Sequence, residues 1–190
     1  MSEESTTETT DVGFKEEIPT KMKIAFGSIG AAVTMLSGIG LGSAITFFYN
    51  VKLGLRPDKI ALAWLIFGIW NAINDPLFGI IEERTKTSIG RRIPYIRYGG
   101  PIFALSFIFL WFPVFTSSQT ALFWNLILVL FLFDSTFTMI GLITYTLPAE
   151  MCITQEARSS FSLYNIIIGA VGMLVSMALP LILLTGYKET

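Results

Sequence analysis

Five long apolar segments dominate the chain and restrict what it can fold into. They run at roughly 24–50, 58–81, 96–116, 120–147 and 159–185. Each reaches the about 20 apolar residues that a membrane-spanning helix needs. A hydrophobic share of 53% and a mean hydropathy of +0.65 also exceed what a water-soluble domain carries. The sequence therefore predicts an all-α polytopic membrane protein with five transmembrane helices, a disordered tail at 1–23 and a short tail at 186–190.

Several classes of site are excluded by the residue types that are scarce or absent. The chain has one cysteine, Cys152, and no histidine, so it cannot form a disulfide framework, a zinc site or a Cys/His nucleophile pair. It also shows no nucleophile–base pair and no phosphate-binding loop. We therefore expect no enzyme activity, no cofactor, no metal centre and no nucleic-acid partner.

The first apolar segment is unusually rich in glycine. It contains Gly27, Gly30, Gly38, Gly40 and Gly42. Gly38 and Gly42 form a small-xxx-small pair, which permits two helices to approach closely. The glycines indicate either tight helix packing or the flexible wall of a cavity.

Two acids lie inside predicted spans, where a charge is costly and often marks an ion or substrate pathway. Asp75 follows Asn71 by one helical turn, and Pro76 leaves a backbone carbonyl free beside the acid. Asp134 lies close to the middle of the fourth span. Asp75 indicates a cation or proton site, with a packing hydrogen bond as the alternative. For Asp134, a transport role and a structural hydrogen bond both stay open.

The distribution of Lys and Arg predicts the orientation in the membrane. With the N-terminus inside, nine of these residues fall on the cytoplasmic side and four on the other. Because cytoplasmic loops are enriched in Lys and Arg, the N-terminus and the 82–97 loop are expected in the cytoplasm. Five spans then place the C-terminus outside. We expect a multi-pass protein of the cell membrane.

The loop after the second span has a dense charged motif, D-P-x-x-G-x-x-x-E-R-T-x-x-x-x-G-R-R-x-P. Its members are Asp75, Pro76, Gly79, Glu83, Arg84, Thr85, Gly90, Arg91, Arg92 and Pro94. The next cytoplasmic loop adds Glu150 and Arg158. Charges of both signs at a helix end can pair with a neighbouring helix, so the sequence predicts a cytoplasmic gate. The alternative is a loop that only fixes topology, although topology requires no acids.

This motif, the preceding I-W-N-A-I-N-D-P and the later Tyr145-x-Leu147-Pro148 resemble the glycoside–pentoside–hexuronide:cation symporters, the melibiose-permease branch of the major facilitator superfamily. The resemblance covers about residues 24–185 and implies the first five helices of a fold that normally has twelve. It implies cation binding by Asn71, Asn74 and Asp75. Asn71 stands where the family commonly has an aspartate.

The resemblance does not extend to sugar recognition. The family's acidic and basic sugar-binding positions correspond here to Ala32, Gly141 and Asn165. We therefore expect cation-coupled transport of a small organic solute, with a sugar or glycoside as a candidate. The coupling ion is H⁺ or Na⁺, and H⁺ is favoured because a single buried acid can bind and release a proton.

The expected partners are the lipid bilayer, the solute and either a second copy or a separately encoded second half. A second half is needed because a lone chain would expose its acids to hydrocarbon. The alternative is a truncated or accessory membrane protein without transport activity of its own.

Overall fold

The structure is a computed structural model that describes residues 16–185; the predicted tails lie outside the described residues at 1–15 and 186–190. Every regular element in the described range is helical, which confirms the all-α fold class. The α-helices are α1 (Thr20–Gly40), α2 (Ser43–Phe47), α3 (Pro57–Arg84), α4 (Gly100–Trp111), α5 (Gln119–Met151) and α6 (Gln155–Thr185). Two π-helical turns span Phe48–Lys52 and Tyr95–Gly99.

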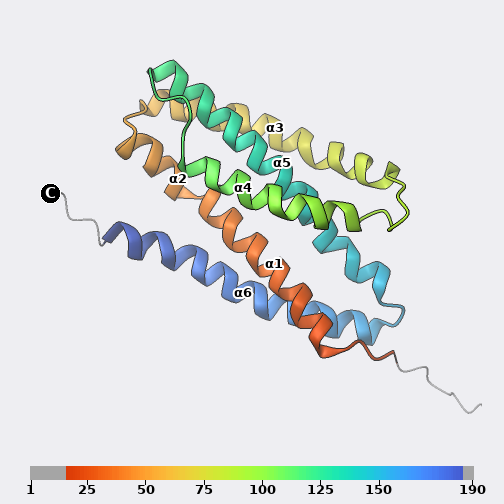
Figure 1. The fold of residues 1–190 in the computed structure, drawn as a ribbon. Coiled ribbons are helices and arrows are strands. Elements are labelled where there is room, and N and C mark those ends of the chain that lie inside the picture. The colour runs from red at the N-terminus through yellow and green to blue at the C-terminus, as the bar shows by residue number, and fades with distance from the viewer. Residues whose placement is uncertain (1–15, 186–190) are drawn as a thin grey trace, which may run out of the picture.

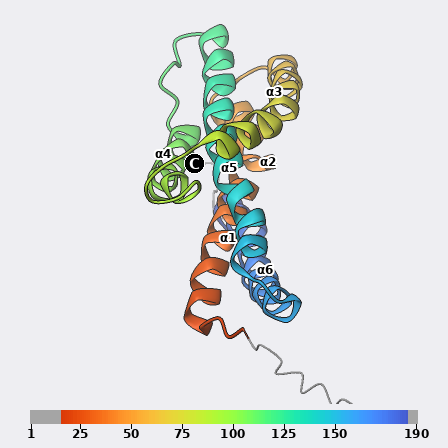
Figure 2. The ribbon, with the colours of Figure 1, turned by 90° about the vertical axis from the view of Figure 1, so that its right-hand side faces the viewer.

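Helix α5 is the central element of the fold. Its first half lies beside α3 and α4, and its second half lies beside α1 and α6 (Figures 1 and 2). Leu126, Leu130 and Phe133 of α5 are almost completely buried, and they belong to one apolar cluster with Ile45 and Tyr49. α5 therefore joins two helix groups that are otherwise largely separate.

Four helical segments are long and apolar enough to cross a membrane. They are Thr20–Lys52, Pro57–Arg84, Gln119–Met151 and Gln155–Ile182. The segment predicted at 96–116 is shorter, because α4 ends at Trp111. Pro113 explains this end, since a proline disfavours helical backbone at the residue before it and cannot itself donate to the helix.

The first predicted helix is interrupted at Leu41 and Gly42, between α1 and α2. A Cβ at Gly42 would lie 2.3 Å from the Gly38 carbonyl oxygen, so only glycine fits this break. A Cβ at Gly38 would instead lie 2.1 Å from Ser176 Oγ of α6. The prediction of close helix contact is thus correct for Gly38, whereas Gly42 serves the break in α1.

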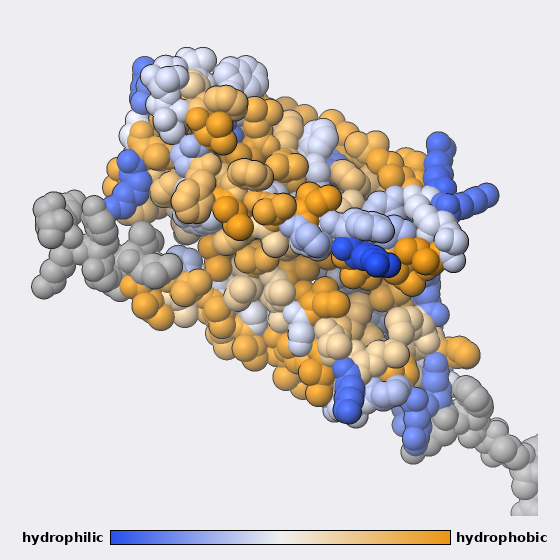
Figure 3. Space-filling view, viewed as in Figure 1, coloured by the Kyte–Doolittle hydropathy of each residue, from blue (hydrophilic) through white to orange (hydrophobic). Residues whose placement is uncertain are grey.

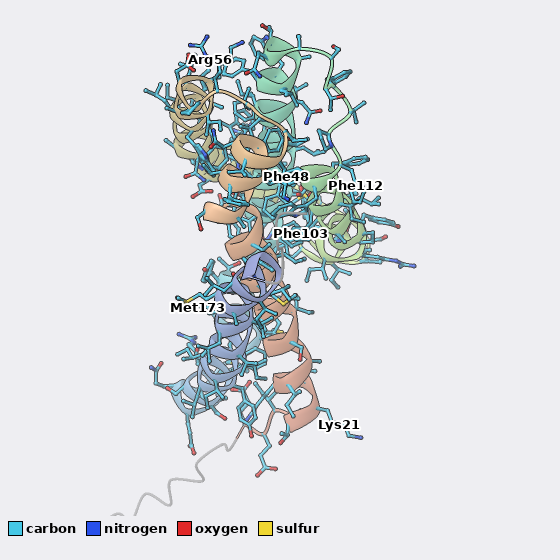
Figure 4. All side chains as sticks on the ribbon, turned by 90° about the vertical axis from the view of Figure 1, so that its left-hand side faces the viewer. Lys21, Phe48, Arg56, Phe103, Phe112 and Met173 are labelled. Carbon is cyan, nitrogen blue, oxygen red and sulfur yellow. The ribbon has the colours of Figure 1, made fainter. Side chains whose placement is uncertain are left out.

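The surface has the polarity of a membrane protein. Apolar residues cover the middle of the face in Figure 3, and hydrophilic residues gather toward its ends. Lys21 and Arg56, which were predicted on opposite sides of the membrane, lie at opposite ends of the molecule in Figure 4. Met173 lies on the outward side of α6, where its side chain is 57% exposed.

The end of the predicted disordered tail is ordered in the structure. α1 begins at Thr20, and Glu16 is fixed to the start of α6. Its Oε2 accepts hydrogen bonds from the backbone N–H groups of Ile153 (2.9 Å) and Thr154 (2.8 Å). The hydrogen bond from the Thr154 backbone N–H is the largest cause of a lowered pKa for Glu16, and the bond from Ile153 lowers this pKa further. A carboxylate satisfies N–H groups that the start of a helix leaves unpaired.

Candidate functional site

A buried polar cluster lies between α3 and α5, about halfway along both helices. α3 contributes Asn71, Asn74 and Asp75, which share one face because residues three and four apart lie together on a helix. α5 contributes Asp134 and Thr138, also one turn apart. All the intramembrane candidates of the sequence therefore meet in one place, including the second acid.

Hydrogen bonds connect the cluster into one network. Asn71 Nδ2 donates to Asp134 Oδ1 (3.1 Å), and Asn74 Nδ2 donates to Asp134 Oδ2 (2.9 Å). Asn74 Nδ2 also donates to Thr138 Oγ1 (2.9 Å), and Thr138 Oγ1 donates to Asp75 Oδ1 (3.0 Å). The two carboxylates are thus joined through neutral side chains.

The amide oxygen of Asn74 accepts no hydrogen bond from the described residues. A carboxylate can only accept hydrogen bonds, so the Asn74 nitrogen must face Asp134 and the oxygen must point elsewhere. Asn74 is completely buried, and its Oδ1 has no hydrogen-bond partner in the described part of the chain. A buried acceptor without a partner costs about 1–3 kcal/mol, which a bound cation would offset.

The two acids differ in burial, and in this the sequence reasoning was wrong. It treated Asp75 as the buried coupling acid, but Asp75 is exposed on α3 and Asp134 is fully buried. Asp134 lies on the face of α5 that packs against α3, whereas Asp75 lies at the edge of this contact. Within residues 16–185, no arginine or lysine forms an ion pair with either acid. The cluster therefore has negative charge without a positive partner.

A second charged cluster lies at the cytoplasmic end predicted from the sequence. Arg92 Nε lies 2.7 Å from Glu82 Oε1, and an Arg92 terminal nitrogen lies 2.9 Å from Glu150. Arg91 also contacts Glu150, at 2.5 Å. The Arg92–Glu82 contact is a close ion pair without an aligned hydrogen bond. This network ties the end of α3 and the following loop to the end of α5.

The network uses Glu82 in place of the predicted Glu83. Glu83 and Arg84 are exposed and make no ion pair with the cluster. Helical phase could have shown this, because Glu82 follows Asn71 and Asn74 by eleven and eight residues and so returns to the same face of α3. Glu83 and Arg84 are turned progressively away from that face.

The loop itself has its own local bonds. The hydroxyls of Thr85 and Tyr95 are hydrogen-bonded to each other, and Thr87 Oγ1 donates to the Gly90 carbonyl. Gly90 has a φ of +102°, which favours glycine. Pro94 directly precedes the π-helical turn.

The remaining predicted gate residues do not join the ion pairs. A Cβ at Gly79 would meet nothing within 4 Å, so close packing does not explain this glycine. Arg158 donates to the carbonyls of Ala149 (3.4 Å) and Cys152 (3.2 Å). It therefore completes the C-terminal end of α5, as a cation does favourably at a helix C-terminus.

The three positions that correspond to the family's sugar-binding residues do not all lie together in the structure. Gly141 and Asn165 line one hollow between α1, α5 and α6. Ala32 is exposed on α1 and does not line it.

Comparison with known proteins identifies the family. A family model described as "MFS/sugar transport protein" matches residues 25–190. The chain is 28% identical to Transmembrane protein 180 of Gallus gallus over 80% of this chain and 31% of that protein. It is 27% identical to an uncharacterized symporter of Synechocystis over 92% of this chain and 32% of that protein.

A further relative is sodium-dependent lysophosphatidylcholine symporter 1 of Mus musculus, 23% identical over 87% of this chain and 32% of the relative. The chain thus spans about a third of the length of the curated relatives it matches. The match to the family model confirms the resemblance inferred from the motifs. This multi-pass membrane protein belongs to the MFS/sugar transport protein family.

Proposed function

We propose that this chain forms the cation-coupling part of a secondary transporter for a small organic solute. The observation that supports this most directly is the α3–α5 cluster, where two carboxylates without a basic partner meet the orphaned Asn74 oxygen. Buried negative charge at mid-membrane requires a proton or a cation to be stable. Binding and release of that ion would drive transport of the solute.

Sodium fits the cluster better than a proton alone. The argument for H⁺ considered one acid alone. In the structure Asp134 accepts hydrogen bonds from Asn71 and Asn74, and Asn74 and Thr138 connect it to Asp75, so that two carboxylates belong to one polar cluster. Na⁺ is a hard cation that prefers several oxygen ligands including anionic ones, as Ca²⁺ and Mg²⁺ do. One relative is also named as sodium-dependent.

The exposed side of α3 supports a covering partner. Asp75 is exposed there, one helical turn from the exposed Ala72 and the half-buried Phe78. Hydrocarbon cannot cover an ionised carboxylate without a cost of several kcal/mol. We therefore propose that a second half, from the same polypeptide, another chain or another copy, covers this side of α3.

The orientation proposed from the loop charges places the 82–97 loop and the N-terminus in the cytoplasm of a cell-membrane protein. In this orientation the ion pairs of Arg91 and Arg92 with Glu82 and Glu150 would hold the cytoplasmic side closed. A cysteine introduced at Thr87 should then resist an impermeant thiol reagent added to intact cells. Its reaction from outside would contradict the orientation.

Binding of ²²Na⁺ to the purified chain in lipid nanodiscs tests the cation proposal. We expect saturable binding that Asp134→Asn abolishes and that Asp75→Asn weakens. Glu83→Gln is the matched control, because it removes a carboxylate from the same helix outside both clusters, and it should bind as wild type. Binding that both aspartate variants retain would overturn the site. If the protein binds no Na⁺ but the reaction of Asp134 with carbodiimide depends on pH, the coupling ion is H⁺.

A further inference from the structure

The loop that joins α3 to α4 has more positive charge than its ion pairs neutralise. Its exposed basic side chains are Arg84, Lys86, Arg91 and Arg97. Arg91 contacts Glu150, whereas within residues 16–185 no carboxylate forms an ion pair with the other three. Glu82 is already paired with Arg92, so Glu83 is the one acid of the stretch 82–97 that is left to oppose them. We call Arg84, Lys86 and Arg97 the basic loop surface.

The first fifteen residues have the opposite charge. Their acids are Glu3, Glu4, Glu8 and Asp11, and their one base is Lys15, so four negative charges less one positive charge give a side-chain charge of −3. An anionic lipid surface repels such a segment, whereas a basic protein surface attracts it. The basic loop surface and segment 1–15 are therefore complementary in charge.

Glu16 fixes the point at which this segment joins the helices. Its carboxylate accepts hydrogen bonds from the backbone N–H groups of Ile153 and Thr154, and Lys23 Nζ donates to Ser160 Oγ (2.7 Å). These contacts tie the start of α1 to the start of α6, next to the end of α5. Figure 1 shows the start of α1, the junction of α5 with α6 and the end of α3 at the same end of the molecule. Segment 1–15 thus joins the helices at the end that holds the basic loop surface.

The segment is long enough to reach from α6 to the loop. Glu150, which contacts Arg91, lies four residues before Thr154, so their Cα atoms are at most about 15 Å apart. An extended chain covers about 3.3–3.6 Å per residue, so Glu8 reaches about 27 Å from Glu16 and the acids before it reach further. The acids of the segment can therefore meet the basic loop surface without any movement of the helices.

We propose that the acidic segment 1–15 docks on the basic loop surface and straps the two helix groups together at this end of the molecule. Each exposed ion pair contributes little and is screened by salt. Weak pairs suffice here, because the covalent link makes docking an intramolecular step with an effective concentration in the millimolar range. The strap joins α1 and α6 to the α3–α4 loop, a connection that the described helices otherwise make mainly through α5. It therefore opposes any motion that separates the two groups.

Carbodiimide cross-linking of the full chain in lipid nanodiscs tests the docking, because this reagent joins a carboxylate to a lysine only where the two are in contact. Lys86 is the one lysine of the loop, and it is exposed. We expect mass spectrometry to find Lys86 in an amide with an acid of segment 1–15. Lys59 lies near the start of α3, at the opposite end of the molecule, and should form no such amide. Amides of Lys86 with Glu83 or Glu150 alone would overturn the docking.

Neutral variants of the loop separate docking from chance encounter. Arg84→Gln with Arg97→Gln keeps Lys86 and every acid of the segment, and it should lower the yield of the cross-link about tenfold because exposed ion pairs are lost. Arg56→Gln with Lys59→Gln is the matched control, since it removes the same charge from the opposite end, and it should keep the yield of wild type. A salt concentration of about 0.5 M should act on wild type as the loop variant does. A yield that neither the loop variant nor salt lowers would refute the proposal.

A thiol in the loop distinguishes the segment from lipid as the occupant of this surface. Ser88 is exposed, and the native Cys152 is 2% exposed and should react slowly. We expect docking to slow the alkylation of Ser88→Cys, and Glu3→Gln, Glu4→Gln and Glu8→Gln together should restore fast reaction. Protection that persists in this triple variant and follows the phosphatidylglycerol content of the nanodisc would assign the basic loop surface to anionic lipid and overturn the docking of the segment.

Discussion

The ion pair between Arg92 and Glu82 should be the most sensitive electrostatic contact in the charged cluster that joins the ends of α3 and α5. The Arg92 and Glu82 side chains are only 12% and 9% exposed, and Nε lies 2.7 Å from Oε1. Removing one partner of a buried pair leaves an uncompensated charge and costs about 3–5 kcal/mol. We therefore expect Arg92→Leu to lower the free energy of unfolding by about 3 kcal/mol or more.

The same network provides its own control. Glu150 is 45% exposed where it contacts Arg91 and Arg92, and solvent screens such pairs. Glu150→Gln should thus cost less than about 1 kcal/mol. The double variant Arg92→Leu with Glu82→Gln removes both buried charges and should recover much of the loss. This non-additivity separates a charge effect from a general loss of packing.

Steric trapping in detergent micelles, which measures unfolding free energy under native conditions, provides the assay. A loss below about 1 kcal/mol for Arg92→Leu would show that water reaches the pair and that the burial argument is wrong. A double variant as unstable as the sum of its single variants would show that Arg92 acts through packing.

Three further changes test other parts of the fold. Gly172→Ala would bring a Cβ to 2.5 Å from a backbone carbonyl of α1 and should cost about 1–3 kcal/mol in the same assay, whereas Gly169→Ala, with nothing within 4 Å, should be neutral. Asn125→Leu removes the acceptor of two backbone N–H groups in the α4–α5 loop and should cost about 1–3 kcal/mol, with faster hydrogen exchange of those amides. The lowered pKa of Glu16 stabilises the fold above its ordinary value of 4.5, and this stabilisation is lost as the pH falls further, so Glu16→Gln should flatten the acid side of the stability–pH curve. A stability–pH curve as steep as that of wild type would show that Glu16 does not contribute to the acid sensitivity. Hydrogen exchange at the Thr154 amide that is no faster in the variant would lead to the same conclusion.

The fold class could be predicted from the sequence because the length of an apolar segment directly reflects the thickness of a membrane. The ends of the helices could not. Gly42 lies in the break between α1 and α2, where a Cβ would lie 2.3 Å from the Gly38 carbonyl oxygen, and this local backbone geometry is not visible in the hydropathy of the segment. The early end of α4 was predictable in principle from Pro113, because proline restricts the residue before it.

The sequence predicted which residues form the polar site but not how they are arranged. Hydropathy shows that Asp75 and Asp134 lie deep in their helices, but it cannot show which side of each helix is covered. Asp134 is buried because α3 packs on its face of α5, whereas Asp75 lies at the edge of that contact. The orphaned oxygen of Asn74 could only be found once the partners of its nitrogen were known.

Helix α5 gives the proposed coupling a physical route, because it contacts both the cation cluster and the hollow between α1, α5 and α6. Coupling between two sites requires an element that has two arrangements and that both ligands bias. We expect the contact between α3 and α5 to provide the two arrangements, because its polar centre holds two carboxylates that repel each other when both are ionised and that a bound cation would draw together. α5 meets the second half, because Thr138 and Gly141 place the cation cluster and the hollow on one rigid helix. Coupling then depends on the position of α5 against α3, and a variant that loosens this contact should uncouple ion from solute while leaving both sites able to bind.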